Sequence, residues 1–160
     1  MGTMAPRNAA APSASPSFNV PFLTHGKTAS LAAFKGQPIM LWQVATWCKS
    51  CAVGLQALAR HEALIDGSRV KVVVLRDYKD AGYPGETMHK FTLAQAPTLL
   101  HDSHFVIGKD TKALFDVYNP HHYVDVYYLI KPDGHVAAVS SNPAITFNKI
   151  KRFVAADGHA

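Results

Sequence analysis

The chain has 160 residues, of which 48% are apolar and 17% charged, and it carries a net charge of +5. This length and apolar content suit one globular domain and exclude a largely disordered chain. Two cysteines are too few for a disulfide-stapled miniprotein or a structural zinc site of cysteines alone, and are enough for one redox pair. The basic residues are scattered without the concentrated stripe that nucleic-acid binding needs, so we expect no nucleic-acid partner.

Residues 1–17 are rich in Ala, Pro and Ser and lack the apolar segment of a signal peptide. A low-complexity composition of this kind cannot bury enough surface to order itself. We therefore expect a disordered tether or a remnant of cloning over residues 1–17 and one domain over residues 18–160. Such a tether fits a protein whose signal or membrane anchor has been removed, or a cytosolic protein with an irregular start.

Apolar runs and periodic patterns predict alternating strands and helices after the tether. Residues 18–34 predict irregular or short-strand structure. Residues 39–44 and 70–75 are continuous apolar runs, which are typical of strands covered on both faces. Between them, residues 48–65 carry apolar side chains at helical spacing, and Gly67 ends this helix. The three elements form a βαβ unit, for which parallel strands and a right-handed crossover are the default.

Shorter elements are predicted for the second half of the chain. In order, we expect a helix over 84–95, a strand or loop over 105–108, a helix over 111–118, strands over 126–130 and 136–139, and a helix over 143–156. The tight turn at residues 132–134 makes the last two strands antiparallel. Asn142 as N-cap and Pro143 at the first helical position predict the start of the final helix. The pattern indicates an α/β domain with a central mixed sheet flanked by helices.

The two cysteines, Cys48 and Cys51, form a single C-x-x-C between the first buried strand and the helix after it. Cys48 falls at or near the helix N-terminus, where unpaired backbone N–H groups and the helix dipole stabilise a thiolate, and Lys49 can add to this effect. Cys51 lies one turn into the helix and is expected to be buried. Thiol–disulfide exchange requires this asymmetry, because an exposed thiolate attacks a disulfide and a less exposed partner resolves the mixed disulfide.

Other interpretations of the cysteine pair stay open. A static disulfide across so few residues would stabilise the chain little, because its loop is short. A zinc ribbon would need a second C-x-x-C, which the sequence lacks. A redox-inert binding module is a further possibility for the chain as a whole.

Residues 39–51, which end in W-C-K-S-C, resemble the strand and W-C-x-x-C segment of the thioredoxin superfamily. The A-T-W-C sequence and residues 128–134 (Y-L-I-K-P-D-G) resemble its TlpA/ResA-like branch of membrane-tethered thiol–disulfide oxidoreductases. The resemblance implies a thioredoxin-like fold with Cys48 as nucleophile and Cys51 as resolving cysteine. From its place directly before the nucleophile, Trp47 is expected to shield Cys48 and to contact partners.

The same resemblance implies an extracytoplasmic location, either periplasmic or anchored to a membrane and facing outside. Its partners would be protein thiols and disulfides, for example in cytochrome or oxidase maturation. A redox-active disulfide would then serve in place of any cofactor. We also expect the protein to be a monomer.

The cis-proline with which this family faces its cysteine pair has no counterpart at the matching position. That position is Asp125, preceded by Val124. In the helix after the cysteines, Gly54 and Gln56 stand where the branch often has Glu and Pro. A carboxylate opposite Cys48 would raise the pKa of the thiol by repulsion, or serve as a base or a ligand.

Two adjacent histidines, His121 and His122, lie in the loop before the strand at 126–130. Two cysteines and a loop histidine resemble the ligand set of the copper-carrying Sco proteins, another thioredoxin-fold family, and such ligands suit Cu(I). This resemblance implies an alternative function as a copper metallochaperone that uses Cys48, Cys51 and His121 or His122. Two features differ from Sco proteins: valine stands at their histidine position, and their cysteines are separated by one residue more. Without copper, the histidines are exposed loop residues and no metal is expected.

Overall fold

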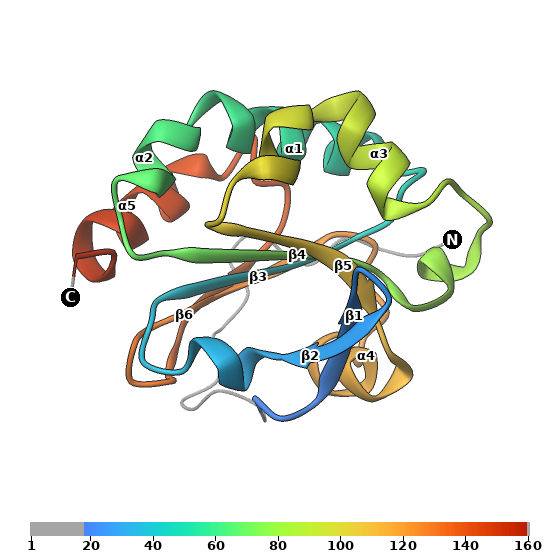
Figure 1. Ribbon diagram of the computed structural model, residues 1–160, viewed down its shortest axis with the longest axis horizontal. Coiled ribbons are helices and arrows are strands. Elements are labelled where there is room, and N and C mark those ends of the chain that lie inside the picture. Colours follow the sequence, from blue (N-terminus) through green and yellow to red (C-terminus); the bar gives the residue numbers. More distant parts are fainter. Residues whose placement is uncertain (1–17, 160) are drawn as a thin grey trace.

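The computed structural model describes residues 18–159, so the tether predicted at residues 1–17 lies outside the described residues. They form a seven-stranded sheet of order β2-β1-β5-β4-β3-β6-β7 with helices on both faces (Figure 1). The strands are β1 (Pro21–Thr24), β2 (Lys27–Ser30), β3 (Ile39–Val44), β4 (Lys71–Arg76), β5 (Phe105–Asp110), β6 (Val126–Ile130) and β7 (Val136–Ser140). The α-helices are α1 (Lys49–Arg60), α2 (Glu62–Asp66), α3 (Met88–Gln95), α4 (Lys112–Tyr118) and α5 (Phe147–Asp157), and the 3-10 helices are η1 (Leu31–Phe34), η2 (Tyr78–Gly82) and η3 (Pro97–His101).

The central strand β3 shows why the sequence contains continuous apolar runs. Its side chains alternate between two cores, with Met40, Trp42 and Val44 in one and Ile39 and Leu41 in the other. The strand pairs parallel with β4 and antiparallel with β6, and β6 pairs antiparallel with β7. These pairings confirm the predicted βαβ unit and the central mixed sheet.

Helices cover the two faces of the sheet unequally. Figure 1 shows α1, α2, α3 and α5 on one face, and α4 on the other beside β1 and β2. The segment predicted as irregular or short strands contains β1 and β2, and residues 105–108, predicted as a strand or a loop, belong to β5. In the described part of the chain, no helix has the length and apolar content needed to cross a membrane.

The helix predicted over 48–65 is interrupted. His61 separates α1 from α2 with a non-helical backbone (φ −107°, ψ 19°), and its ring stacks on Phe147 with ring centroids 3.9 Å apart. Cys48 lies just outside the helix, as the N-cap of α1. The apolar periodicity that predicts one helix runs through both, and therefore does not reveal the break.

Two later helices begin further along the chain than predicted. The N-terminus of α3 is set by Thr87, whose side chain accepts a hydrogen bond from the Lys90 N–H at 3.2 Å. For α5, the prediction of Asn142 as N-cap is wrong. Asn142 has a φ of 53°, which is left-handed and not the extended conformation of an N-cap. Its carbonyl closes a tight turn instead, and Thr146 is the N-cap.

Candidate functional site

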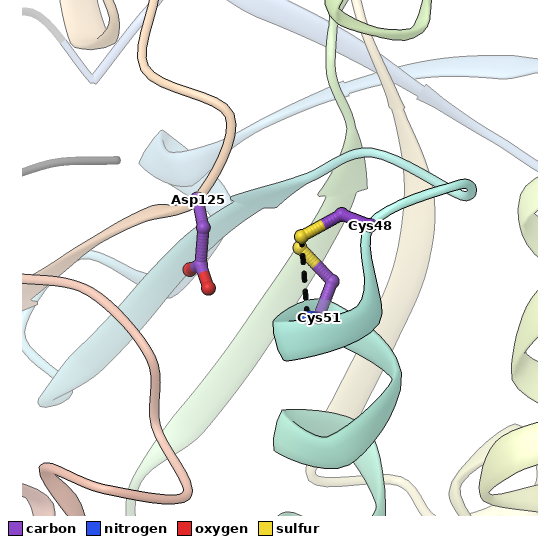
Figure 2. A group of neighbouring side chains, drawn as sticks. All are labelled: Cys48, Cys51 and Asp125. Atoms are coloured by element: carbon purple, nitrogen blue, oxygen red, sulfur yellow. Dashed lines mark hydrogen bonds between the residues drawn. The ribbon is translucent and has the colours of Figure 1, made fainter. Parts of the chain in front are cut away.

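The two cysteines lie where β3 leads into α1 (Figure 2). Cys48 is 8% exposed, whereas Cys51, one helical turn away, has no exposed surface. Both are free thiols, and the Cys48 Sγ accepts a hydrogen bond from the Cys51 N–H at 3.4 Å. An otherwise unpaired N–H of the helix N-terminus thus points at the sulfur nearer the surface.

The two thiols differ in acidity. The pKa of Cys48 is lowered to about 7, chiefly because the Cys51 side chain hydrogen-bonds its sulfur. The Ser50 hydroxyl also lowers this pKa, while burial and the negative charge of Asp125 raise it. Burial raises the pKa of Cys51 well above its ordinary value. Cys48 is therefore the thiol that ionises near neutral pH; Lys49 lies exposed beside it, and its effect on Cys48 stays a prediction.

Asp125, which directly precedes β6, is fully buried and faces the cysteine pair (Figure 2). Its Oδ1 accepts a hydrogen bond from the Trp42 indole N–H at 2.7 Å. Its Oδ2 accepts from the Ser50 hydroxyl at 2.9 Å and from the Asn142 N–H at 3.3 Å. Burial raises the pKa of Asp125, and these three donors oppose the rise because they stabilise the carboxylate.

The carboxylate occupies the side of the cysteine pair on which the thioredoxin resemblance places a proline. Cys48, Cys51 and Asp125 each offer an atom that could bind a metal ion, and these atoms all lie within 4.8 Å of one another. Val124 is buried, and its bond to Asp125 is trans, since the described residues contain no cis peptide bond. Asp125 therefore lies where it could act as a base toward the cysteines or as a third ligand to a metal ion that they bind.

Close packing of α1 on β3 brings the Trp42 indole to Asp125. A Cβ atom on Gly54 would lie 2.6 Å from the Trp42 ring, so only glycine leaves room for the indole in its present position. Gln56 points elsewhere: its side chain donates a hydrogen bond to Gln95 at 2.7 Å. The glycine at this position thus permits the hydrogen bond between Trp42 and Asp125.

Trp47 is anchored immediately before the nucleophile. Its indole N–H donates to the Asp80 carbonyl at 2.7 Å, and its ring meets Tyr83 in a T-shaped contact with centroids 5.4 Å apart. The Asp80 carboxylate in turn accepts hydrogen bonds from the Thr46 N–H at 2.8 Å and the Thr46 hydroxyl at 2.7 Å. These contacts fix the orientation of the indole next to Cys48, and its shielding role stays a prediction.

The two loop histidines are not brought to the cysteines. His121 and His122 line a separate cavity of about 510 Å³, which also has Asp77 and Phe115 in its wall. The His122 ring lies against Phe115 with centroids 5.0 Å apart. Among residues 18–159, the group of potential metal ligands around the cysteines includes Asp125 and no histidine.

Sequence reasoning missed the hydroxyl of Ser50. A hydroxyl between two cysteines at a helix N-terminus signals a possible hydrogen bond to a thiolate. Its second partner, Asp125, is 75 positions away in the sequence and could be found only once the fold had placed β6 beside β3.

Comparisons with known proteins bear on the family and the fold of the chain. The AhpC/TSA family matches residues 12–139 of the sequence. No curated protein sequence matches the chain.

Three solved structures illustrate the similarity in fold. A protein assigned as a thiol:disulfide interchange protein DsbE from Chlorobium tepidum has a TM-score of 0.69 and 18% identity, over 91% of this chain and 98% of that one. A secreted Mycobacterium tuberculosis disulfide oxidoreductase, described as homologous to E. coli DsbE, has a TM-score of 0.66 and 21% identity, over 87% and 96%. Arabidopsis thaliana ScoI with copper bound has a TM-score of 0.60 and 14% identity, over 90% and 99%. At these identities the likeness shows the fold alone, and it confirms the predicted thioredoxin-like class.

Proposed function

The chain belongs to the AhpC/TSA family, and we propose that it is a thiol–disulfide oxidoreductase that acts on protein thiols and disulfides. The observation that carries this proposal is the difference between its two thiols. Cys48 reaches the surface with a pKa lowered to about 7, and Cys51 is buried with a pKa raised well above the ordinary value. A nucleophile and a resolving thiol need these opposite properties.

The proposed reaction has two steps. The Cys48 thiolate attacks a substrate disulfide, the substrate S–S bond breaks, and one substrate sulfur leaves as a thiolate while the other stays in a mixed disulfide with Cys48. Cys51 then loses its proton to Asp125 and attacks the Cys48 sulfur, which releases the second substrate thiolate. Two electrons pass from the cysteine pair to the substrate, and a thiol reductant restores the pair.

Three further residues support this chemistry in the proposal. Trp47 shields the nucleophile and contacts the partner protein, because its indole is fixed directly before Cys48. Lys49 adds a positive charge beside the thiolate. Val124 packs in the core and holds the main chain that carries Asp125.

We place this activity outside the cytoplasm, with the protein acting as a monomer in which residues 1–17 serve as a tether. The secreted disulfide oxidoreductase of similar fold supports this location. The substrates would be extracytoplasmic proteins such as those of cytochrome or oxidase maturation. The pair itself carries the electrons, so the reaction draws on no separate cofactor.

Disulfide exchange by the reduced protein tests the proposal. We expect the wild type to reduce insulin disulfides faster than an equal concentration of glutathione, and Cys48→Ser to abolish this activity. Cys51→Ser should accumulate a mixed disulfide, visible by mass spectrometry, because Cys48 can attack but nothing resolves the product. A wild type no faster than glutathione would contradict the proposal.

A copper-carrying function is the second candidate, favoured by the close grouping of Cys48, Cys51 and Asp125 and by the similar fold of copper-bound ScoI. Titration of the reduced protein with Cu(I) against a colorimetric chelator tests it. Stoichiometric binding lost in the double variant His121→Ala/His122→Ala would support a ligand set of the Sco type. Binding lost only with the cysteines would assign the cargo to the thiolates, and no binding would remove this candidate.

A further inference from the structure

A short hydrogen-bonded path joins the nucleophilic sulfur to the buried carboxylate. The Cys48 Sγ lies 3.2 Å from the Ser50 Oγ, and the Ser50 hydroxyl lies 2.9 Å from the Asp125 Oδ2. Ser50 belongs to the first turn of α1, so the helix backbone holds its hydroxyl beside Cys48. Asp125 reaches the same hydroxyl from the start of β6.

The serine hydroxyl has one hydrogen, so it can donate to only one of these two neighbours at a time. While it donates to the Asp125 carboxylate, its oxygen can accept the hydrogen of the Cys48 thiol. Once Asp125 holds a proton, the direction reverses: Asp125 donates to the serine oxygen, and the serine hydrogen turns to the Cys48 thiolate. Both arrangements satisfy every group along the path.

We propose that the Ser50 hydroxyl is a proton relay between the Cys48 thiol and the Asp125 carboxylate, so that the two groups share one proton. In the transfer, the S–H bond of Cys48 breaks as an O–H bond forms on Ser50. The original Ser50 O–H bond breaks as an O–H bond forms on Asp125. A thiol and a carboxylate become a thiolate and a carboxylic acid, and no electrons change hands. The relay rests on the proposed oxidoreductase function, because it prepares the thiolate that attacks the substrate. The first substrate thiolate to leave then takes the proton from Asp125, which frees the carboxylate to accept the proton of Cys51 in the second step.

The environment favours such sharing. The pKa of Cys48 is lowered and that of Asp125 is raised, so the two groups move toward each other in acidity. Three other titratable groups interact electrostatically with Asp125, namely Cys51 from α1, Asp77 after β4 and Tyr127 from β6. Their interaction with Asp125 acts through space. Ser50 differs because it hydrogen-bonds both Cys48 and Asp125.

A double-mutant cycle on the titration of Cys48 tests the relay. The rate of alkylation of the reduced full chain by iodoacetamide is measured against pH, and Cys48 is identified as the reacting residue by mass spectrometry. In the wild type, Asp125→Asn should lower the midpoint by about one pH unit, because it removes a negative charge and replaces the carboxylate, which competes with the thiolate for the Ser50 hydrogen, by a weaker acceptor. In a Ser50→Ala background only the charge effect remains, and we expect less than half of that shift.

Matched variants separate the relay from a structural role. Ser50→Ala alone should raise the midpoint, and Ser50→Thr, which keeps the hydroxyl, should restore the wild-type coupling. Asp77→Asn should leave the midpoint unchanged with or without Ser50, because Asp77 is not among the groups that shift the pKa of Cys48. Exposed Ser103→Ala should change nothing, and circular dichroism checks that each variant is folded.

Equal shifts from Asp125→Asn in both backgrounds, or no restoration of the coupling by Ser50→Thr, would overturn the relay. Failure of the underlying function has a different signature. There, the wild-type midpoint lies in the ordinary thiol range and insulin reduction is absent, whatever the double-mutant cycle shows.

Discussion

Two buried carboxylate sites in this protein are supplied with hydrogen bonds in different ways. Asp125 accepts three hydrogen bonds from its neighbours beside the cysteines. The other site is the pair of Asp77, directly after β4, and Asp110, the last residue of β5. Asp77 accepts bonds from the Asn119 amide at 3.1 and 3.3 Å, whereas neither oxygen of Asp110 receives a hydrogen bond from a donor group of the described residues. Asp77 and Asp110 can hydrogen-bond each other only while one of them keeps a proton.

The difference shows that burial and donors together decide what a buried acid can do. Burial raises the pKa of the acids at both sites. In the pair, the pKa of Asp77 rises to about 7 and that of Asp110 rises well above its ordinary value. At Asp125 the three donors offset part of the same effect. Asp110 therefore holds its proton, while Asp125 is set to exchange a proton with its neighbours.

Replacing Asp125 or Asp110 by alanine should have the largest effects on stability, and the two effects should differ most from each other. Asp125→Ala leaves the buried indole N–H of Trp42 without an acceptor, and we expect the free energy of unfolding to fall by about 2–4 kcal/mol. Asp110→Ala strands no donor and removes a costly buried acid, so its loss should be about 1 kcal/mol or less. Urea unfolding at neutral pH, followed by tryptophan fluorescence, measures both. Equal losses would break the comparison between the two sites.

The pH dependence of stability should identify the Asp77–Asp110 pair. The pKa of Asp77 is raised from 3.8 to about 7 on folding, so the native state holds this proton more tightly than the unfolded chain. The stability it contributes is fully present below the unfolded pKa and is lost as the pH rises through about 7. We expect a decline of roughly 1–3 kcal/mol between about pH 4 and pH 8.

The variant Asp110→Asn supplies a permanent donor to Asp77 and should flatten this decline. Asp125, Asp66 and Glu62, whose pKa values are also raised, contribute to the part that remains. Exposed Asp116→Asn is the control and should leave the slope as in the wild type. Unfolding midpoints in urea across the pH range measure the slope, and a wild-type slope in Asp110→Asn would contradict a shared proton.

The acidity of Cys48 should separate the two carboxylate sites by function. Asp110→Asn should leave the alkylation midpoint of Cys48 near pH 7, because Asp110 is not among the groups that shift its pKa. Asp125→Asn should lower the midpoint, since the Asp125 charge opposes the thiolate. The same alkylation profile measures both variants. A shift with Asp110→Asn would show that the two acids act as one network.

The smallest effect on the acidity of Cys48 is expected at Lys49. Its charge lies beside the cysteines, but it is far more hydrated than the buried Asp110 and Asp125. Lys49→Ala should raise the Cys48 midpoint by about 0.2–0.5 pH unit, because an exposed charge is screened by water. The shift should fade at high salt, whereas that of buried Asp125→Asn should persist. A salt-independent shift at Lys49 would contradict the screening argument.

Local patterns predict most of the fold, because its central elements are simple. The apolar runs at β3 and β4 and the helical spacing after Cys48 are set by burial on both faces of the sheet and on one face of α1. The start of α5 is mispredicted, since the backbone N–H of Asn142 bonds Asp125 and the residue adopts a left-handed turn. A rule based on neighbouring residues cannot detect this hydrogen bond to a residue distant in sequence.

The candidate site divides in the same way. The cysteines and the helix N-terminus are neighbours in sequence, so the motif predicts their unequal environments. The position of Asp125 opposite them follows from the resemblance to the thioredoxin superfamily. The hydrogen bonds of Asp125 to Trp42 and Ser50, and the meeting of Asp77 with Asp110, arise only when strands distant in sequence pair in the sheet.

Gly54 has a consequence for mutational tolerance. Any side chain at this position would displace the Trp42 ring, and with it a hydrogen-bond donor to Asp125. In a saturation library selected for redox activity, we expect position 54 to reject even alanine, a residue that otherwise favours helices more than glycine does. A requirement for proton transfer at Asp125 would then restrict substitutions at a glycine, which has no side-chain functional group of its own.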